Sequence, residues 1–262
     1  MRTRWLAMGA AAVAVGALAP GVATGMGGTK LTASLNSSQE VPKPTGVSAG
    51  AGGAFTATVN AGTNPRLTWR LTFKGLSGSA LQAHVHLGSP KKAGPVAVTL
   101  CGPCQSGAKG SAPITPAVRK ALLNGTAYVN VHTPTNAAGE IRGQVALPVK
   151  AKLTVGAERP APTGAQGGNG SFTGQLVGRR LAWTLTFAKL TGPAVQAHIH
   201  LGRRGVAGPV AVALCGPCRS GVRGTSTLTA AQLGELKAGR TYVNVHTPTN
   251  GAGEIRGQLR AG

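Results

Sequence analysis

The chain repeats itself at a fixed distance, and this repetition limits its fold more than any other feature of the sequence. The segment QAHVHLG at residues 82–88 returns as QAHIHLG at 196–202, an offset of 114 residues (196 − 82). The segments LCGPC, YVNVHTPTN and GEIRGQ return at the same offset. Because solenoid repeats have periods of about 20 to 50 residues, a repeat of this length predicts two tandem domains. We place them at residues 31–147 and 153–260, with a boundary near Pro148–Lys150 and little linker.

Within each copy, apolar and polar residues alternate with a period of two, which is the pattern of half-buried strands. In Leu67–Phe73 the Leu, Trp and Phe residues share one face, and Leu181–Phe187 repeats this pattern. A short helix is predicted after Thr115, an N-cap residue that precedes Pro116, and its counterpart follows Thr229. The expected fold class is therefore all-β, with two tandem antiparallel β-sandwich or barrel domains that each hold one short helix. Other strands of the first copy are predicted at Leu31–Leu35, Ala54–Val59, Gln82–Leu87, Pro95–Leu100, Thr126–His132 and Glu140–Leu147.

Residues 1–25 have the pattern of a secretory signal peptide. Arg2 and Arg4 precede an almost wholly apolar run from Trp5 to Ala19, and small residues follow. The run of about 15 apolar residues is shorter than the roughly 20 that span a bilayer, and no later segment is longer. We therefore expect a secreted, extracytoplasmic protein whose mature form has no transmembrane segment.

The charge balance is very basic because acids are scarce. Lys and Arg total 27 against five acids, all of them Glu, so the formal net charge is +22. The absence of Asp from the sequence excludes Asp-based triads and most Mg²⁺ or Ca²⁺ sites. No run of basic residues exceeds two, and the expected cores use several of the few aromatic residues, so specific nucleic-acid binding is not expected. The partners that we expect are anionic cell-envelope polymers, attracted by charge, or another extracellular protein.

All six histidines lie in the repeated motifs, three in each copy. His84 and His86 are two residues apart on a predicted strand, so their side chains share one face. The same parity places Asn130 and His132 on the polar face of a second strand, and Arg142 on that of a third. If these three strands are neighbours, one sheet face of each domain collects the histidines together with the other polar side chains.

This face has two interpretations. Three imidazoles can hold copper or zinc and leave one coordination position open, with Glu140 orienting a ligand or acting as a base. Alternatively, the residues form a hydrogen-bonded network, with Glu140 paired to Arg142 or to a histidine, and we favour this network because buried polar groups are normally satisfied by such partners. The candidate metal ligands are His84, His86, His132, His198, His200 and His246. The candidate network residues are Gln82, Asn130, Glu140, Arg142, Gln196, Asn244, Glu254 and Arg256.

Each copy also contains one CGPC segment, at Cys101–Cys104 and at Cys215–Cys218. Thioredoxin has the same four residues, but that redox motif stands at a helix N-terminus in a βαβ unit. Here each segment follows an apolar strand and precedes a loop rich in Gly and Ser. In an exported protein, two cysteines per domain favour the local disulfides Cys101–Cys104 and Cys215–Cys218 over a metal site or a redox catalyst.

Taken together, these motifs resemble the CHRD domain, which is named for chordin and is widespread in bacterial secreted proteins. The resemblance rests on AHVHLG at 83–88, GPV at 94–96, GTAYVNVHT at 125–133 and GEIRGQ at 139–144. It covers essentially all of both domains and implies an all-β extracellular module with no settled enzymatic activity. The His-x-His strand also resembles the copper strand of copper/zinc superoxide dismutase. However, the chain has no Asp for that family's zinc site and too few histidines in each copy for its two-metal cluster.

The function expected from the sequence is a secreted, non-enzymatic binding or structural module at the cell envelope, and no catalytic residue is identified. The alternative is a metal-binding protein that uses the His-x-His pair and the third histidine of each domain. Four of the five glutamates occupy matched positions, Glu40 with Glu158 and Glu140 with Glu254. In a chain with so few acids, these glutamates mark the positions most worth testing.

Overall fold

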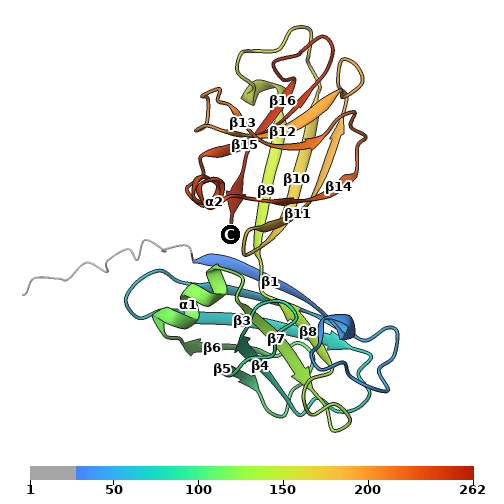
Figure 1. The fold of residues 1–262 in the computed structure, drawn as a ribbon, viewed down its shortest axis with the longest axis vertical. Helices are drawn as coiled ribbons and strands as arrows, with labels where there is room; N and C mark the ends of the chain where they lie inside the picture. The colour runs from blue at the N-terminus through green and yellow to red at the C-terminus, as the bar shows by residue number, and fades with distance from the viewer. Residues whose placement is uncertain (1–27) are drawn as a thin grey trace, which may run out of the picture.

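The structure is a computed structural model that describes residues 28–262. The signal peptide predicted for residues 1–25 lies outside the described residues. The chain fills two lobes along the long axis of the molecule, the first coloured from blue to green and the second from yellow to red (Figure 1). We call residues 28–146 module 1 and residues 147–262 module 2.

Module 1 is a single antiparallel sheet of eight strands with one α-helix. The spatial order of its strands is β5-β4-β7-β8-β1-β2-β3-β6, which joins strands that are far apart in the sequence. The elements are β1 (Thr29–Asn36), the 3-10 helix η1 (Ser37–Gln39), β2 (Gly52–Val59), β3 (Arg66–Lys74), β4 (Gln82–Leu87), β5 (Val96–Cys101), β6 (Lys109–Pro113), α1 (Pro116–Leu123), β7 (Ala127–His132) and β8 (Ile141–Gln144).

Module 2 repeats this topology strand for strand. Its order is β13-β12-β15-β16-β9-β10-β11-β14, and the short strand β17 pairs with β9. Its edge strands β13 and β14 approach one another, so the sheet curls into a nearly closed barrel. The elements are β9 (Leu147–Thr154), the 3-10 helix η2 (Val155–Ala157), β10 (Asn169–Val177), β11 (Arg180–Ala188), β12 (Gln196–Leu201), β13 (Val210–Cys215), β14 (Val222–Thr227), α2 (Ala230–Lys237), β15 (Thr241–His246), β16 (Ile255–Gln258) and β17 (Arg260–Ala261).

The predicted all-β fold class and the short helix of each module are confirmed. The Thr115 side chain accepts a hydrogen bond from the Val118 amide, and Thr229 forms a capping box with Gln232. These side chains satisfy amide groups that would otherwise lack partners at the start of each helix. The N-cap pattern in the sequence therefore identified both helix starts.

The sequence missed one strand of each module and made another strand too long. The sequence did not predict β6 or β14, because these edge strands alternate between exposed and half-buried residues and lack an apolar face. The strand predicted at Glu140–Leu147 is too long: β8 ends at Gln144, and Ala146 bridges to Thr32. Leu147 already begins β9. The apolar pattern continues across this point because the chain passes directly from the core of one module into that of the next.

The core of each module lies inside the curled sheet. Trp69 and Trp183 are 7% and 6% exposed, as the alternating pattern predicted. Each tryptophan packs against a glycine of the neighbouring edge strand. A Cβ atom at Gly110 would lie 2.3 Å from the Trp69 ring, and one at Gly224 would lie 2.4 Å from the Trp183 ring. The edge strand therefore packs this close to the tryptophan only because a glycine stands at the contact.

The two modules contact each other directly. Thr32 Oγ1 in β1 donates to Gln175 Oε1 in β10 at 2.9 Å. Lys237 Nζ at the end of α2 donates to the Leu123 carbonyl at 3.2 Å and to Asn124 Oδ1 at 3.0 Å. Since β9 begins immediately after the last residues of module 1, no separate linker joins the two sheets.

Candidate metal centre

The three strands that carry the predicted polar face are neighbours in the sheet. Strand β4 pairs with β7, which places Gln82 opposite His132 and His84 opposite Asn130, and β7 pairs in turn with β8. Val85 on β4, which alternates with the histidines, is fully buried in the core. The period-two pattern therefore turns the histidines to the outer face of the sheet, where the loops that follow β4 and β7 cover them.

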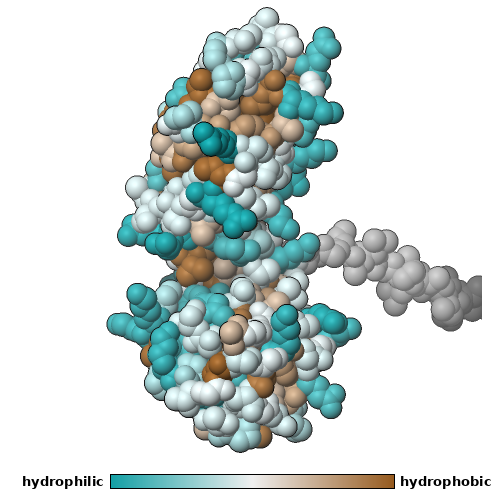
Figure 2. Space-filling view, turned by 90° about the vertical axis from the view of Figure 1, so that its right-hand side faces the viewer, coloured by the Kyte–Doolittle hydropathy of each residue, from teal (hydrophilic) through white to brown (hydrophobic). Residues whose placement is uncertain are grey.

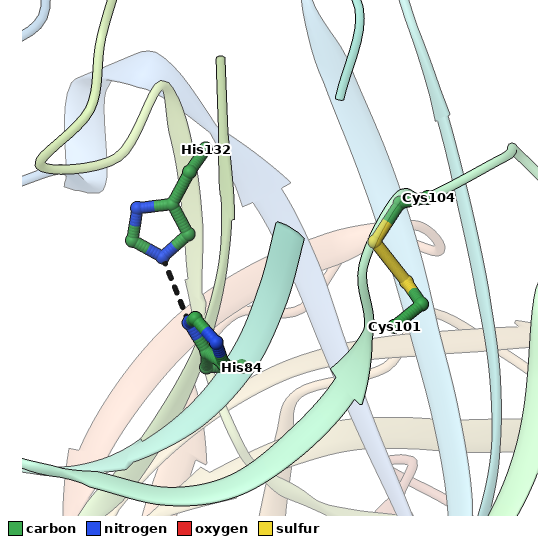
Figure 3. Close-up of a disulfide and its surroundings, with 4 residues drawn as sticks. All are labelled: His84, Cys101, Cys104 and His132. Carbon is green, nitrogen blue, oxygen red and sulfur yellow. Dashed lines mark hydrogen bonds between the residues drawn. A yellow bond between two sulfur atoms is a disulfide. The ribbon is translucent and has the colours of Figure 1, made fainter. Parts of the chain in front are cut away.

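The imidazoles of each module converge. One ligating nitrogen from each of His84, His86 and His132 lies within 4.8 Å of the other two. His84 Nδ1 and His132 Nε2 are 3.2 Å apart (Figure 3). Module 2 brings its three histidines together within the same limit, and the pair equivalent to His84 and His132 is 3.1 Å apart. The second set comprises His198, His200 and His246.

Backbone carbonyls determine which imidazole nitrogens carry protons. His86 Nδ1 lies 2.8 Å from the Gly94 carbonyl, and His132 Nδ1 lies 2.9 Å from the Ala137 carbonyl. Because a carbonyl only accepts hydrogen bonds, both Nδ1 atoms carry the proton and both Nε2 atoms keep a lone pair. His86 Nε2 is buried and has no hydrogen-bond partner among the described residues. Module 2 has the same arrangement, including the unpartnered Nε2 of His200.

Burial keeps these imidazoles neutral. Desolvation, followed by the charges of His132 and His86, lowers the pKa of His84 to about 4. Desolvation also lowers the pKa of His86 and of His132, although the hydrogen bonds to backbone carbonyls oppose this effect. The pKa values of all three histidines of module 2 are lowered, again with desolvation as the largest cause. The neutral imidazole is the form that binds metal ions.

Arg142 holds the loop that covers the site. Its guanidinium carbon lies 3.4 Å from the centre of the Tyr128 ring, and this ring stacks on His86 with centroids 4.9 Å apart. Arg142 Nη2 donates to the carbonyls of Ser89 and Lys92 at 3.1 and 3.0 Å. These hydrogen bonds fix the loop that presents the Gly94 carbonyl to His86, so Arg142 supports the site through the backbone.

Glu140 does not join the histidines, and its predicted pairing with Arg142 or with a histidine is wrong. The carboxylate accepts hydrogen bonds from the Ser77 amide and hydroxyl, from Thr133 Oγ1 and from Asn136 Nδ2. Burial raises the pKa of Glu140, but these hydrogen bonds outweigh burial, and the pKa is lowered overall. The carboxylate therefore ties the loop between β3 and β4 to the loop between β7 and β8. Glu254 makes the same contacts in module 2.

A comparison with family models identifies the fold. The model of the CHRD domain matches residues 31–145 and again residues 149–259. The chain belongs to the CHRD domain family. No curated protein matches the chain. Within residues 28–262, neither helix has the length and apolar character that crossing a membrane requires.

The buried acid whose charge interacts with Arg142 in the first CHRD module is Glu40, which the sequence marked only as a matched glutamate. A Cβ atom at Gly139 would lie 2.4 Å from Glu40 Oε2 and 2.8 Å from Asn130 Nδ2, so carboxylate and amide meet at this glycine. Desolvation raises the pKa of Glu40, and the positive charge of Arg142 opposes this shift. Glu158 stands in the same place in module 2.

Not every predicted network residue joins the network. Gln82 and Gln196 are exposed at the start of their strands, whereas Asn130 and Asn244 are buried beside the histidines. The sequence also missed Ser77, which supplies two hydrogen bonds to Glu140. Ser77 lies on the loop between β3 and β4, outside the histidine-bearing strands. Its contact with Glu140 forms only in the folded protein, so no local sequence pattern predicts it.

The predicted disulfides Cys101–Cys104 and Cys215–Cys218 are both present. Each lies at the end of the strand beside the first histidine, as Figure 3 shows for Cys101 and His84. With all four sulfurs in disulfides, the two segments provide no thiolates for zinc.

In module 2, a hollow of about 620 Å³ beside the disulfide is lined by Gln196, His198 and Pro217. Through this hollow, His198 of the module 2 histidine cluster is reached from solvent.

Proposed function

We propose that each CHRD module binds one copper or zinc ion through its three histidines. One observation carries this proposal: one nitrogen from each of three imidazoles lies within 4.8 Å of the other two, backbone carbonyls hold the Nδ1–H of two of these rings, and the same arrangement occurs in both modules. Histidines that bind a metal commonly donate their other N–H to a carbonyl in this way. Three neutral imidazoles suit copper and zinc, and they leave a position for water or a small ligand.

The distances fit this site after a small movement. Nitrogen atoms about 2.0 to 2.1 Å from a tetrahedral ion lie roughly 3.4 Å from one another. His84 Nδ1 and His132 Nε2 are already 3.2 Å apart. The largest separation between any two of the three ligating nitrogens is at most 4.8 Å. Bringing the three nitrogens to the tetrahedral spacing therefore needs a shift of at most about 1.4 Å, which we assign to His86 because His84 and His132 are already close together.

A purely structural network explains these positions less well. In that interpretation His84 Nδ1–H donates to His132 Nε2, which satisfies one contact. However, His86 Nε2 and His200 Nε2 are buried and make no hydrogen bond of standard geometry, although the side chains of Asn130 and Asn244 lie close enough to act on the pKa of each ring. An unsatisfied buried acceptor costs about 1 to 3 kcal/mol. A metal ion would bind this nitrogen in each module.

The cellular location belongs to the same proposal. We infer that the protein works outside the cytoplasm, where the disulfides of both modules persist. The leader-like pattern at residues 1–25 supports this inference. An extracytoplasmic protein with two such sites would bind copper or zinc at the cell envelope.

The test is metal stoichiometry in protein prepared without an affinity tag. After removal of metal by a chelator, titration with Cu²⁺ or Zn²⁺ at pH 7 should load two ions per chain. His86→Ala and His200→Ala should each remove one ion, and the double variant should remove both. Gln82→Ala is the matched control, because this exposed residue lies on the same strand and its side chain forms no hydrogen bond with the three histidines. Less than about 0.2 ion per module in the intact protein would refute the proposal.

A further inference from the structure

A second feature of the molecule lies where module 2 meets β1 of module 1, and none of the six histidines lines it. A groove of about 620 Å³ runs along the outward side of β9 and β16. On the face that Figure 2 shows, hydrophilic side chains lie above and below the junction between the two lobes, next to one apolar patch. Six exposed cationic side chains line the groove: Lys30, Lys150, Lys152, Arg159, Arg204 and Arg260.

No acidic side chain lines this groove. The only salt bridge among the described residues joins Arg240 to Glu235, outside the groove. Lysine and arginine side chains are positively charged at neutral pH. Their charges therefore add up along the groove, and a hollow lined by charges of one sign attracts ions of the opposite sign.

The groove is not a general property of the fold, because module 1 lacks its charges. The pairing of Asn36 with Arg142 corresponds to that of Thr154 with Arg256, which aligns β1 with β9. The alignment places Thr32 and Ser34 where module 2 has lysines. Four cations of the groove thus have neutral counterparts: Lys150 aligns with Thr32, Lys152 with Ser34, Arg159 with Val41 and Arg260 with Ala146. Arg204 is left out of this set, because Lys91 lies in the equivalent loop of module 1.

We propose that this groove of module 2 binds a linear phosphate-bearing polymer. The cations come from five separate segments, so a single small anion would contact only a few of them, whereas a chain can follow them all. Lys150 and Lys152 are two residues apart on one face of β9, a spacing of about 7 Å along the strand. Such a row of cations suits a ligand with repeated charges, and its binding gains from the release of counterions.

Phosphate is the anion that best fits the mixture of side chains. Arg159, Arg204 and Arg260 offer guanidinium groups, which donate two parallel hydrogen bonds to phosphate oxygens. The lysines add compact charges that bind phosphate from several directions. This proposal does not depend on the metal sites, since the groove residues are not ligands of either histidine set.

The experiment replaces the four module-specific cations by the residues that module 1 has at the same places. The variant carries Lys150→Thr, Lys152→Ser, Arg159→Val and Arg260→Ala. Its fold should be retained, because module 1 forms the strand equivalent to β9 and the bridge at Ala146 with these residues. The control variant removes four exposed cations elsewhere, with Lys74, Lys92, Lys109 and Lys120 each changed to Gln. Both variants lose the same charge.

Binding is measured with inorganic polyphosphate at several salt concentrations, with orthophosphate and polygalacturonate as competitors. We expect the groove variant to bind polyphosphate at least tenfold more weakly, and its slope of log K against log salt to fall by roughly 3. The control variant should change binding less than threefold. If both variants lose the same amount of polyphosphate affinity, net charge alone explains the binding and the proposal is overturned. Competition by polygalacturonate as strong as by polyphosphate would overturn the assignment to phosphate, and displacement by orthophosphate at equal phosphate concentration would overturn the assignment to a polymer.

Discussion

The two modules share one interior and differ on one outer face. The pair His84 and His132 is separated by 3.2 Å, and the equivalent pair of module 2 by 3.1 Å. The carbonyl contacts of His86 and His200 are both 2.8 Å. By contrast, Thr32 and Ser34 on the outer face of β1 correspond to two lysines on β9. Features that the shared architecture requires, such as the histidine contacts, therefore occur in both modules. The lysines of β9 occur in module 2 only, and we relate them to a partner of that module.

The largest loss of stability is expected from the buried glutamates. Glu140→Ala should lower the free energy of unfolding of module 1 by about 3 kcal/mol, because the donors on Ser77, Thr133 and Asn136 lose a charged acceptor. Glu254→Ala should have the same effect on module 2. Hydrogen exchange followed by mass spectrometry reports each module separately. A loss confined to one of the two variants would show that the interiors are not equivalent.

A somewhat smaller loss is expected where the edge strand meets the tryptophan. Gly110→Ala places a methyl group 2.3 Å from the Trp69 ring, and Gly224→Ala places one 2.4 Å from Trp183. Overpacking of this kind costs about 2 to 3 kcal/mol. Chemical denaturation monitored by tryptophan fluorescence would measure it. Gly234→Ala is the control, since a Cβ atom there meets nothing within 4 Å. Unchanged stability in the Gly110 variant would contradict the close packing described for this edge.

The disulfides should contribute less to the stability of the fold. Each closes a loop with a sequence separation of only 3. Closing so short a loop removes little chain entropy, so Cys101→Ser with Cys104→Ser should cost at most about 2 kcal/mol. The same pair of changes at Cys215 and Cys218 should match it. Thermal unfolding of the two double variants measures both effects, and the collapse of either module would refute this ranking.

The last prediction concerns the pH dependence of stability, which we expect to be the most gradual of these effects. In metal-free protein, the pKa of His84 is lowered from 6.5 to about 4 by burial and neighbouring histidines. Between these values the unfolded chain binds the proton and the folded chain does not, so stability is full above pH 6.5 and falls as the pH drops towards 4. The raised pKa of Glu40 acts in the opposite direction. Urea denaturation across this range, with His84→Gln as the comparison, should show a smaller acid-induced loss in the variant.

Much of the candidate site followed from local patterns. The spacing of His84 and His86 on a strand placed both on one face, and the CGPC spacing led to the disulfides. The partner of Glu140 did not follow, because Ser77 is 63 residues away and reaches the carboxylate only when the sheet curls. The edge strands β6 and β14 were missed for a related reason: they are held by hydrogen bonds to a neighbour and not by an apolar face of their own.

The sequence by itself determined the two modules, most of their inner strands, the face on which each histidine lies and the scarcity of acids, because repeats, strand periodicity and charge are properties of the chain alone. Only the tertiary structure decided that β4, β7 and β8 are neighbours, that three imidazoles of each module converge, and that the cations beside β9 line one groove. Each of these depends on contacts between distant residues. Such contacts form when strands pair and loops close over them, and no single segment encodes them.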